Sequence, residues 1–197
     1  MRETQIQKYQ KLNELAREKG VVIFGSDADA NIPLCELRQA FELEENMYNR
    51  SFENLSIKDA VSVYDACVAP IKPETVLIHI GEHDLQMLQQ TPDEYDRKFQ
   101  ELINHIRSLN RDCRIGIISL RNTNNNYEIS FMNQHLKYIA ESERCEFGDI
   151  SKQRVWNPKA SKSTASFLRS IGFMETLKTP KPLFDLIRIL FCEEVLV

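Results

Sequence analysis

The sequence contains little glycine, no closely spaced cysteine pair and no apolar run of membrane-spanning length. Only six of its 197 residues are glycine, and no Gly-x-Gly-x-x-Gly or P-loop pattern for holding nucleotide phosphates occurs. The five cysteines are widely spaced and odd in number, which excludes a disulfide framework or a zinc-finger pattern. The first residues are charged from Arg2 onward and do not resemble a signal peptide. We therefore expect a cytoplasmic domain with reduced thiols, no cofactor or metal, and no membrane contact.

The charge of the chain is small overall but unevenly distributed. A net charge of −4 argues against nucleic-acid binding. Residues 151–181 nevertheless have a charge of +6, because one acidic residue, Glu175, accompanies seven basic ones: Lys152, Arg154, Lys159, Lys162, Arg169, Lys178 and Lys181. Such a segment is commonly a solvated surface. The alternative is a site for a small anionic ligand or an acidic partner, and the sequence leaves both open, as it does the oligomeric state.

Short apolar runs alternate with helical periodicity along the chain. The runs that predict strands are 21–25, 46–51, 75–81, 114–119 and 145–150. His79 lies within the third run and is predicted to be a core histidine with satisfied hydrogen bonds. Capping boxes at Ser56–Asp59 and Thr91–Glu94 predict two helix starts, and an apolar helix is expected over 183–192. We expect one domain over 1–197, with an N-terminal helix in 1–20 that ends at Lys19-Gly20.

Five strands separated by helices predict a parallel sheet covered on both faces, because parallel crossovers require helices. In such sheets the ligand crevice lies beyond the C-terminal ends of the strands. Functional residues are therefore expected in four segments that follow predicted strands: 26–31, 49–56, 82–85 and 119–126.

Three of these segments belong to blocks that resemble the SGNH (GDSL-type) hydrolase family. Val21–Asp27 ends in Gly-Ser-Asp and resembles the first block, in which a strand ends in Gly-Asp-Ser and the serine is the nucleophile. Tyr48–Asn54 is similar to the second block, in which a glycine N–H binds the oxyanion. Lys72–Asp84 ends in Gly-Glu-His-Asp and is similar to the third block, Gly-x-Asn-Asp, whose asparagine is another oxyanion donor.

The resemblance extends over about residues 21–192, and it implies both a fold and an ancestry. The fold is a three-layer, flavodoxin-like α/β domain with a five-stranded parallel sheet in the order 2-1-3-4-5 and helices on both faces. The ancestry is in ester hydrolysis on acyl, acetyl or lipid substrates.

The same blocks depart from the family pattern at the residues that perform the chemistry. Ser26 stands where the family has aspartate, and Asp27 stands where it has the nucleophile. Asn54 replaces the oxyanion glycine, although its backbone N–H can still serve if the turn is kept, and His83 replaces the oxyanion asparagine. The family's Asp-x-x-His block is missing, because no histidine follows His135. The leading hypothesis is a catalytically degenerate domain, a pseudoenzyme that keeps a polar crevice for a ligand or partner.

Two enzymatic alternatives remain open. In the first, an active esterase or deacetylase, Ser26 is the nucleophile and His83 the base. Asp27 or Asp84 then orients the imidazole; the simpler interpretation is that His83 is a polar crevice residue and Asp84 caps the following turn. In the second alternative, Asp27 and Asp29 bind Mg²⁺ for phosphatase or phosphotransfer chemistry, as in haloacid-dehalogenase phosphatases. The simpler interpretation is that these aspartates are N-caps.

Overall fold

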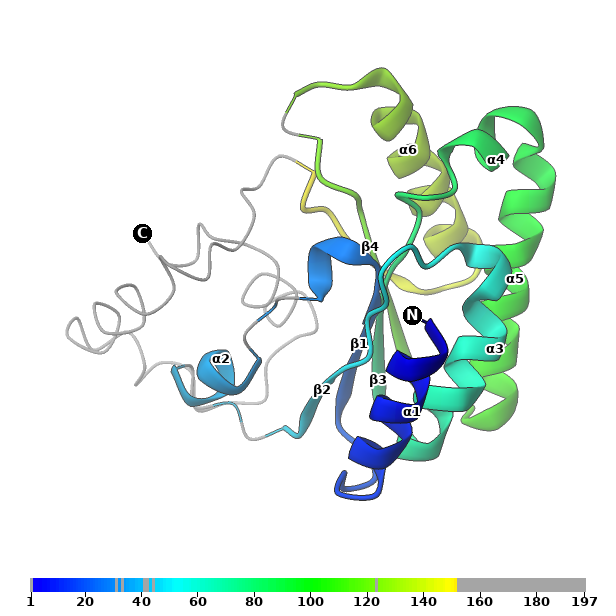
Figure 1. Cartoon of the computed structure of the whole chain (residues 1–197). Helices are drawn as coiled ribbons and strands as arrows, with labels where there is room; N and C mark the ends of the chain where they lie inside the picture. Colours follow the sequence, from blue (N-terminus) through cyan, green and yellow to red (C-terminus); the bar gives the residue numbers. More distant parts are fainter. Residues whose placement is uncertain are drawn as a thin grey trace.

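A five-stranded parallel sheet forms the centre of the structure (Figure 1). The computed structural model describes residues 2–151, apart from 31, 33, 41, 42, 44 and 123. The strands are β1 (Val21–Gly25), β2 (Met47–Asn49), β3 (Thr75–His79), β4 (Arg114–Ile118) and β5 (Glu146–Gly148). Every neighbouring pair is parallel, and the order is β2-β1-β3-β4-β5. Both the five strands and their order are those predicted from the sequence.

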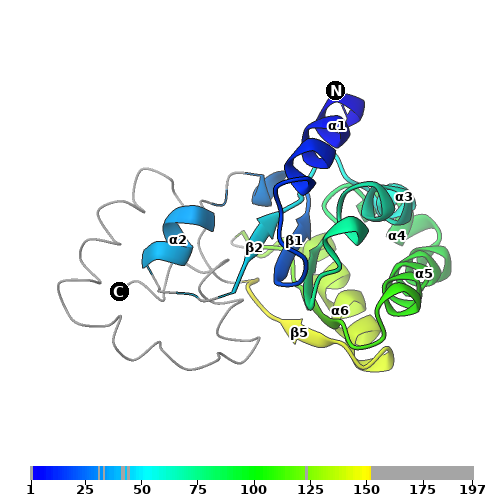
Figure 2. The same ribbon diagram turned by 90° about the horizontal axis from the view of Figure 1, so that it is seen from below.

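Helices lie on both sides of this sheet. One side carries α1 (Arg2–Asn13), α3 (Ile57–Cys67), α5 (Pro92–Leu109) and α6 (Tyr127–Ser142), and α2 (Leu34–Ala40) lies on the other side, beside β2 (Figures 1 and 2). Shorter helices are η1 (Asp27–Asp29), η2 (Ala69–Ile71) and α4 (Leu85–Gln90). None of the described helices combines the length and the apolar composition that a bilayer crossing requires. The helix predicted over 183–192 lies outside the described residues.

The main hydrophobic core lies between the sheet and the layer formed by α3, α5 and α6. Alternate strand residues face it: Val22, Phe24, Val76, Ile78, Ile115 and Ile117. Helix α5 buries one apolar face in the same core: Tyr95, Phe99, Leu102, Ile103 and Ile106. The intervening strand residues Ile23 and Leu77 are also fully buried. The two central strands are thus covered on both faces, as is usual for parallel sheets.

Two helix boundaries differ in detail from the sequence prediction, and a third agrees with it. Ser56 caps α3 as predicted, because its Oγ accepts a hydrogen bond from the N–H of Lys58 at 3.3 Å. Thr91 does not cap α5 with its side chain; its hydroxyl donates to the carbonyl of Met87, at 3.2 Å, because α4 leads directly into α5. Helix α4 itself was not predicted. The N-terminal helix ends at Asn13, earlier than Lys19-Gly20, and those two residues form a left-handed turn into β1.

Burial of three cysteine thiols leads to a prediction about their reactivity. Burial raises the pKa of Cys67, Cys113 and Cys145 to about 11. The reactive species is the thiolate, so we expect iodoacetamide at pH 7.5 to alkylate these residues about 100-fold more slowly in the native than in the denatured protein. Cys35 is exposed and serves as the internal control. Site-resolved mass spectrometry measures the rates, and native rates at Cys67 and Cys113 that equal the denatured rates would contradict this structure.

Candidate functional site

The parallel pairing of β1 with β3 places two of the predicted functional segments side by side. The strands pair along their whole length, so Ser26 and Asp27 at the end of β1 lie beside Glu82 and His83, which follow β3. The loop after β2 adds Asn54, whose backbone N–H donates to Asp27. The structure therefore brings together four of the residues singled out in the sequence, and it adds Glu82.

The carboxylate of Asp27 lies at the centre of this group. Its Oδ1 accepts a hydrogen bond from the N–H of Asn54 at 2.7 Å, and its Oδ2 lies 3.0 Å from Nε2 of His83. Asn54 has a φ of 54°, a left-handed conformation that asparagine tolerates, so the turn in which the family places glycine is retained. The N–H that would face an oxyanion in a family hydrolase is therefore already bound to a carboxylate of this chain.

Ser26 is almost completely buried, with 1% of its surface exposed. Its Oγ donates a hydrogen bond to Oε2 of Glu82 at 2.9 Å. Glu82 was not among the predicted site residues, because Glu82 occupies the variable position of the Gly-x-Asn-Asp pattern. The position of Glu82 directly after the predicted strand 75–81 could have indicated it as a functional residue. The serine hydroxyl is thus paired with Glu82, whereas His83 is paired with Asp27.

Asp84 belongs to the interior rather than to the crevice surface. Its Oδ1 accepts from Oγ of Ser56 at 2.5 Å and its Oδ2 accepts from the N–H of Ile57 at 3.0 Å. The expectation that Asp84 caps the turn after it is wrong, since its side chain makes no cap hydrogen bond to α4. It instead ties the loop after β3 to the start of α3. Burial raises the pKa of this carboxyl, and the hydrogen bonds from Ser56 and Ile57 lower it in part.

Asp29 and His79 form a second buried pair, beneath the crevice. Nδ1 of His79 lies 2.9 Å from each carboxylate oxygen of Asp29, and both side chains are buried. His79 is therefore a core histidine with a hydrogen-bond partner. Asp29 faces the interior and Asp27 is exposed, so the two carboxylates do not converge as the Mg²⁺ alternative requires.

Groups that could hold a cation gather at the C-terminal ends of β1 and β3. One ligand-type atom each from Asp27, Glu82 and His83 lies within 4.8 Å of the other two. Two of the three side chains in this group are therefore acidic. The basic segment, for which the sequence left a solvated surface and an anion site open, cannot be assigned to either, because residues 152–181 lie outside the described part of the chain.

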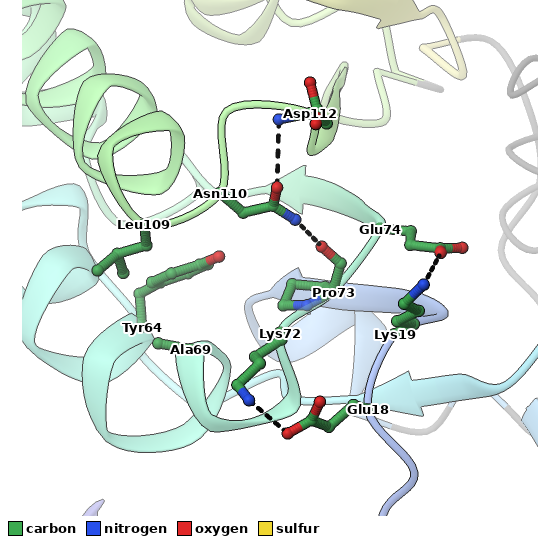
Figure 3. A pocket seen from close by; sticks show the side chains of 10 residues that line it. All are labelled: Glu18, Lys19, Tyr64, Ala69, Lys72, Pro73, Glu74, Leu109, Asn110 and Asp112. Atoms are coloured by element: carbon green, nitrogen blue, oxygen red, sulfur yellow. Dashed lines mark hydrogen bonds and ion pairs between the residues drawn. The ribbon is translucent and has the colours of Figure 1, made fainter.

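A separate pocket of about 400 Å³ lies at the opposite end of the sheet, where the strands begin (Figure 3). Four of its charged side chains form two ion pairs at the rim. Nζ of Lys72 lies 2.5 Å from Oε1 of Glu18, and Nζ of Lys19 lies 3.5 Å from Oε1 of Glu74. Because these charged groups already have partners, and because ligands of open α/β sheets bind at the C-terminal rather than the N-terminal ends of the strands, we assign this pocket no ligand.

Comparison with known proteins supports the fold that the sequence predicts. No protein-family model and no curated protein sequence matches the chain. A Streptococcus pneumonia protein provisionally described as a platelet activating factor aligns with a TM-score of 0.66 and 15% identity, over 86% of this chain and 91% of that one. An acetylxylan esterase from Geobacillus stearothermophilus aligns with a TM-score of 0.56 and 19% identity, over 80% and 96% of the two chains.

A GDSL-like lipase from Bacteroides thetaiotaomicron aligns with a TM-score of 0.57 and 11% identity, over 87% of this chain and 97% of that one. These similarities, together with the strand order, show that the chain has an SGNH/GDSL hydrolase-like fold. At identities this low the similarity establishes the fold alone.

The buried Asp29–His79 pair depends on the absence of a side chain at Gly25. A Cβ atom at this position would lie 1.7 Å from Oδ2 of Asp29. We expect Gly25→Ala to lower the free energy of unfolding by about 1–3 kcal/mol, measured by urea denaturation, because the pair must move. The Asp29→Ala background is the control, since there the same change should cost little. Equal costs in the two backgrounds would show that this contact does not restrict position 25.

Asp84 provides a second stability test. Asp84→Ala leaves the hydroxyl of Ser56 and the N–H of Ile57 without their buried acceptor, and we expect a loss of about 1–3 kcal/mol in the free energy of unfolding. Asp84→Asn keeps one acceptor oxygen and should cost less. Because burial raises the pKa of Asp84, protonation stabilises the folded state.

The stability of the wild type relative to Asp84→Asn is therefore highest below the unfolded-state pKa of about 4 and falls as the pH rises through the folded-state pKa. Urea denaturation of both proteins from pH 3 upward measures this difference. A difference that is constant with pH, or that grows as the pH rises, would contradict the assignment of a raised pKa to this carboxyl.

Proposed function

We propose that this chain is a non-hydrolytic, SGNH-fold domain whose crevice at the C-terminal strand ends binds a ligand or partner. The observation that supports the proposal is the carboxylate of Asp27, which accepts the N–H of Asn54 at 2.7 Å. An ester hydrolase needs such donors directed at the oxygen that becomes negative in the transition state. In this chain a fixed negative charge uses the donor instead, and it would repel an oxyanion. We also propose a cytoplasmic location, with which the free thiols of the described cysteines agree.

The position of the serine supports the same conclusion. Ser26 is buried and its proton is shared with Glu82, so an ester carbonyl cannot reach Oγ without a rearrangement. The sequence contains no histidine after His135 that could take the place of the family's base. Removal of a single oxyanion donor typically lowers kcat by about 10²–10³, and loss of the nucleophile–base pair lowers it much further. Together these changes bring the expected rate close to that of the uncatalysed reaction.

An active esterase or deacetylase is the second candidate, and one contact favours it. The hydroxyl of Ser26 donates to the carboxylate of Glu82 at 2.9 Å, and a carboxylate can act as a general base. In this candidate Glu82, rather than His83, accepts the proton. Asp27 must also release the N–H of Asn54 before a substrate carbonyl can bind there.

The charges of the described crevice bear on the kind of ligand. Asp27 and Glu82 present carboxylates there, and Asp84 is a buried third carboxylate close in sequence. Such a site favours a cation or a ligand rich in hydrogen-bond donors over an anion. A small anionic ligand would have to bind through the basic segment, which lies outside the described residues.

An ester-hydrolysis assay tests the proposed function. We expect the full-length protein to hydrolyse p-nitrophenyl acetate and butyrate at the protein-free rate, with an active SGNH esterase as the positive control. Ser26→Ala should leave this background unchanged. Turnover of about 1 s⁻¹ or more, lost in Ser26→Ala and in Glu82→Gln, would overturn the proposal and establish the second candidate.

A further inference from the structure

We propose that Asp27, Glu82 and His83 form a binding site for a divalent transition-metal ion of the Zn²⁺ type. The inference rests on the proposed function in one respect, that the crevice binds a ligand. The three residues follow two neighbouring strands, and one ligand atom from each lies within 4.8 Å of the others. The side chains of His83 and Asp27 are 31% and 45% exposed, so an ion can enter from solvent.

The spacing of these atoms suits a metal of this size. Bonds from Zn²⁺ to nitrogen and oxygen are about 2.0–2.2 Å long, so neighbouring ligand atoms of a tetrahedral site lie roughly 3.3–3.6 Å apart. Nε2 of His83 and Oδ2 of Asp27 are already 3.0 Å apart. Small rotations of the Glu82 and His83 side chains bring the whole set, which spans at most 4.8 Å, to those distances. The site has three protein ligands, which leaves a coordination position for water or a ligand group.

Charge and hydrogen bonding in the site also favour a cation. Two carboxylates and a neutral imidazole carry a charge of −2, which complements a divalent ion. Each carboxylate is held by a donor outside the set: the N–H of Asn54 binds Oδ1 of Asp27, and Oγ of Ser26 binds Oε2 of Glu82. Hydrogen bonds of this kind orient metal ligands and raise the affinity for the ion. They also give the buried serine a role, the positioning of Glu82.

The imidazole determines which class of ion fits best. Mg²⁺ and Ca²⁺ are bound by oxygen ligands, whereas imidazole nitrogen favours Zn²⁺ and related transition metals. A third ligand sets this site apart from other His–Asp pairs of the chain. His105 pairs with Asp65 at 2.5 Å and has a similar exposure of 29%, but within the described residues no third ligand-type side chain accompanies that pair. His105 is therefore a matched control.

Isothermal titration calorimetry of the full-length protein with ZnCl₂ tests the proposal. The titrations use a Cys35→Ser background, because the exposed thiol of Cys35 is itself a zinc ligand. We expect one site, weakened at least about tenfold by His83→Ala and by Glu82→Gln, because loss of a ligand costs at least as much as loss of its hydrogen-bond partner. His105→Ala should leave the affinity unchanged. MgCl₂ should bind at least about tenfold more weakly than ZnCl₂.

Circular dichroism establishes that each variant is folded, and the increase in Tm with Zn²⁺ gives a second measure of binding. Absence of a Zn²⁺ site, equal affinity in wild type and His83→Ala, or equal affinity for Mg²⁺ would overturn the inference. The ester assay on the same samples, with and without Zn²⁺, separates the two proposals. Absence of both binding and hydrolysis overturns the metal site alone, whereas Zn²⁺-dependent hydrolysis lost in His83→Ala overturns the non-hydrolytic function alone.

Discussion

The parallel pairing of β1 with β3 is the constraint on which the rest of the site depends. Alternate residues of β1 are buried on opposite faces of the sheet. Val22 and Phe24 face the layer of α3, α5 and α6, and Ile23 faces the other side. A shift of one residue would move Val22 and Phe24 out of the core that they share with α3, α5 and α6, so the close packing of this core favours the observed register. With the register determined, the ends of the two strands must lie side by side, and the residues that follow them share one crevice.

The exchange of two adjacent residues then explains the character of that crevice. Successive side chains of an extended segment point in opposite directions, and Ser26 has an extended backbone. With serine first and aspartate second, the hydroxyl is buried against Glu82 and the carboxylate of Asp27 is exposed beside the N–H of Asn54. The family order places the hydroxyl at the second position. Under the proposed function, the inverted order places a negative charge where the resemblance implies donors for a negative oxygen.

The fold was predictable from the sequence, because strand-length apolar runs, helical periodicity and the three blocks all indicate one topology. The same topology predicts that the residues after β1 and β3 lie close together. The contacts within the crevice were not. The alternation that pairs Ser26 with Glu82 becomes evident only when both strand ends are in place, and Glu82 occupies a position where the family tolerates any residue. Asp84 was expected to cap the turn that follows it because local capping is the commoner pattern, whereas its side-chain partners, Ser56 and Ile57, come from a distant part of the chain.

Under the proposed function Ser26 is not a nucleophile, because its hydroxyl is buried and the N–H of Asn54 is bound to Asp27. A fluorophosphonate probe tests this directly, since it forms a covalent adduct with the activated serine of a hydrolase. Intact-mass and peptide mass spectrometry after incubation should show the full-length protein unmodified, under conditions in which an active SGNH esterase is labelled completely. A stoichiometric adduct on Ser26 would show that this serine is an activated nucleophile and would contradict the proposed non-hydrolytic function.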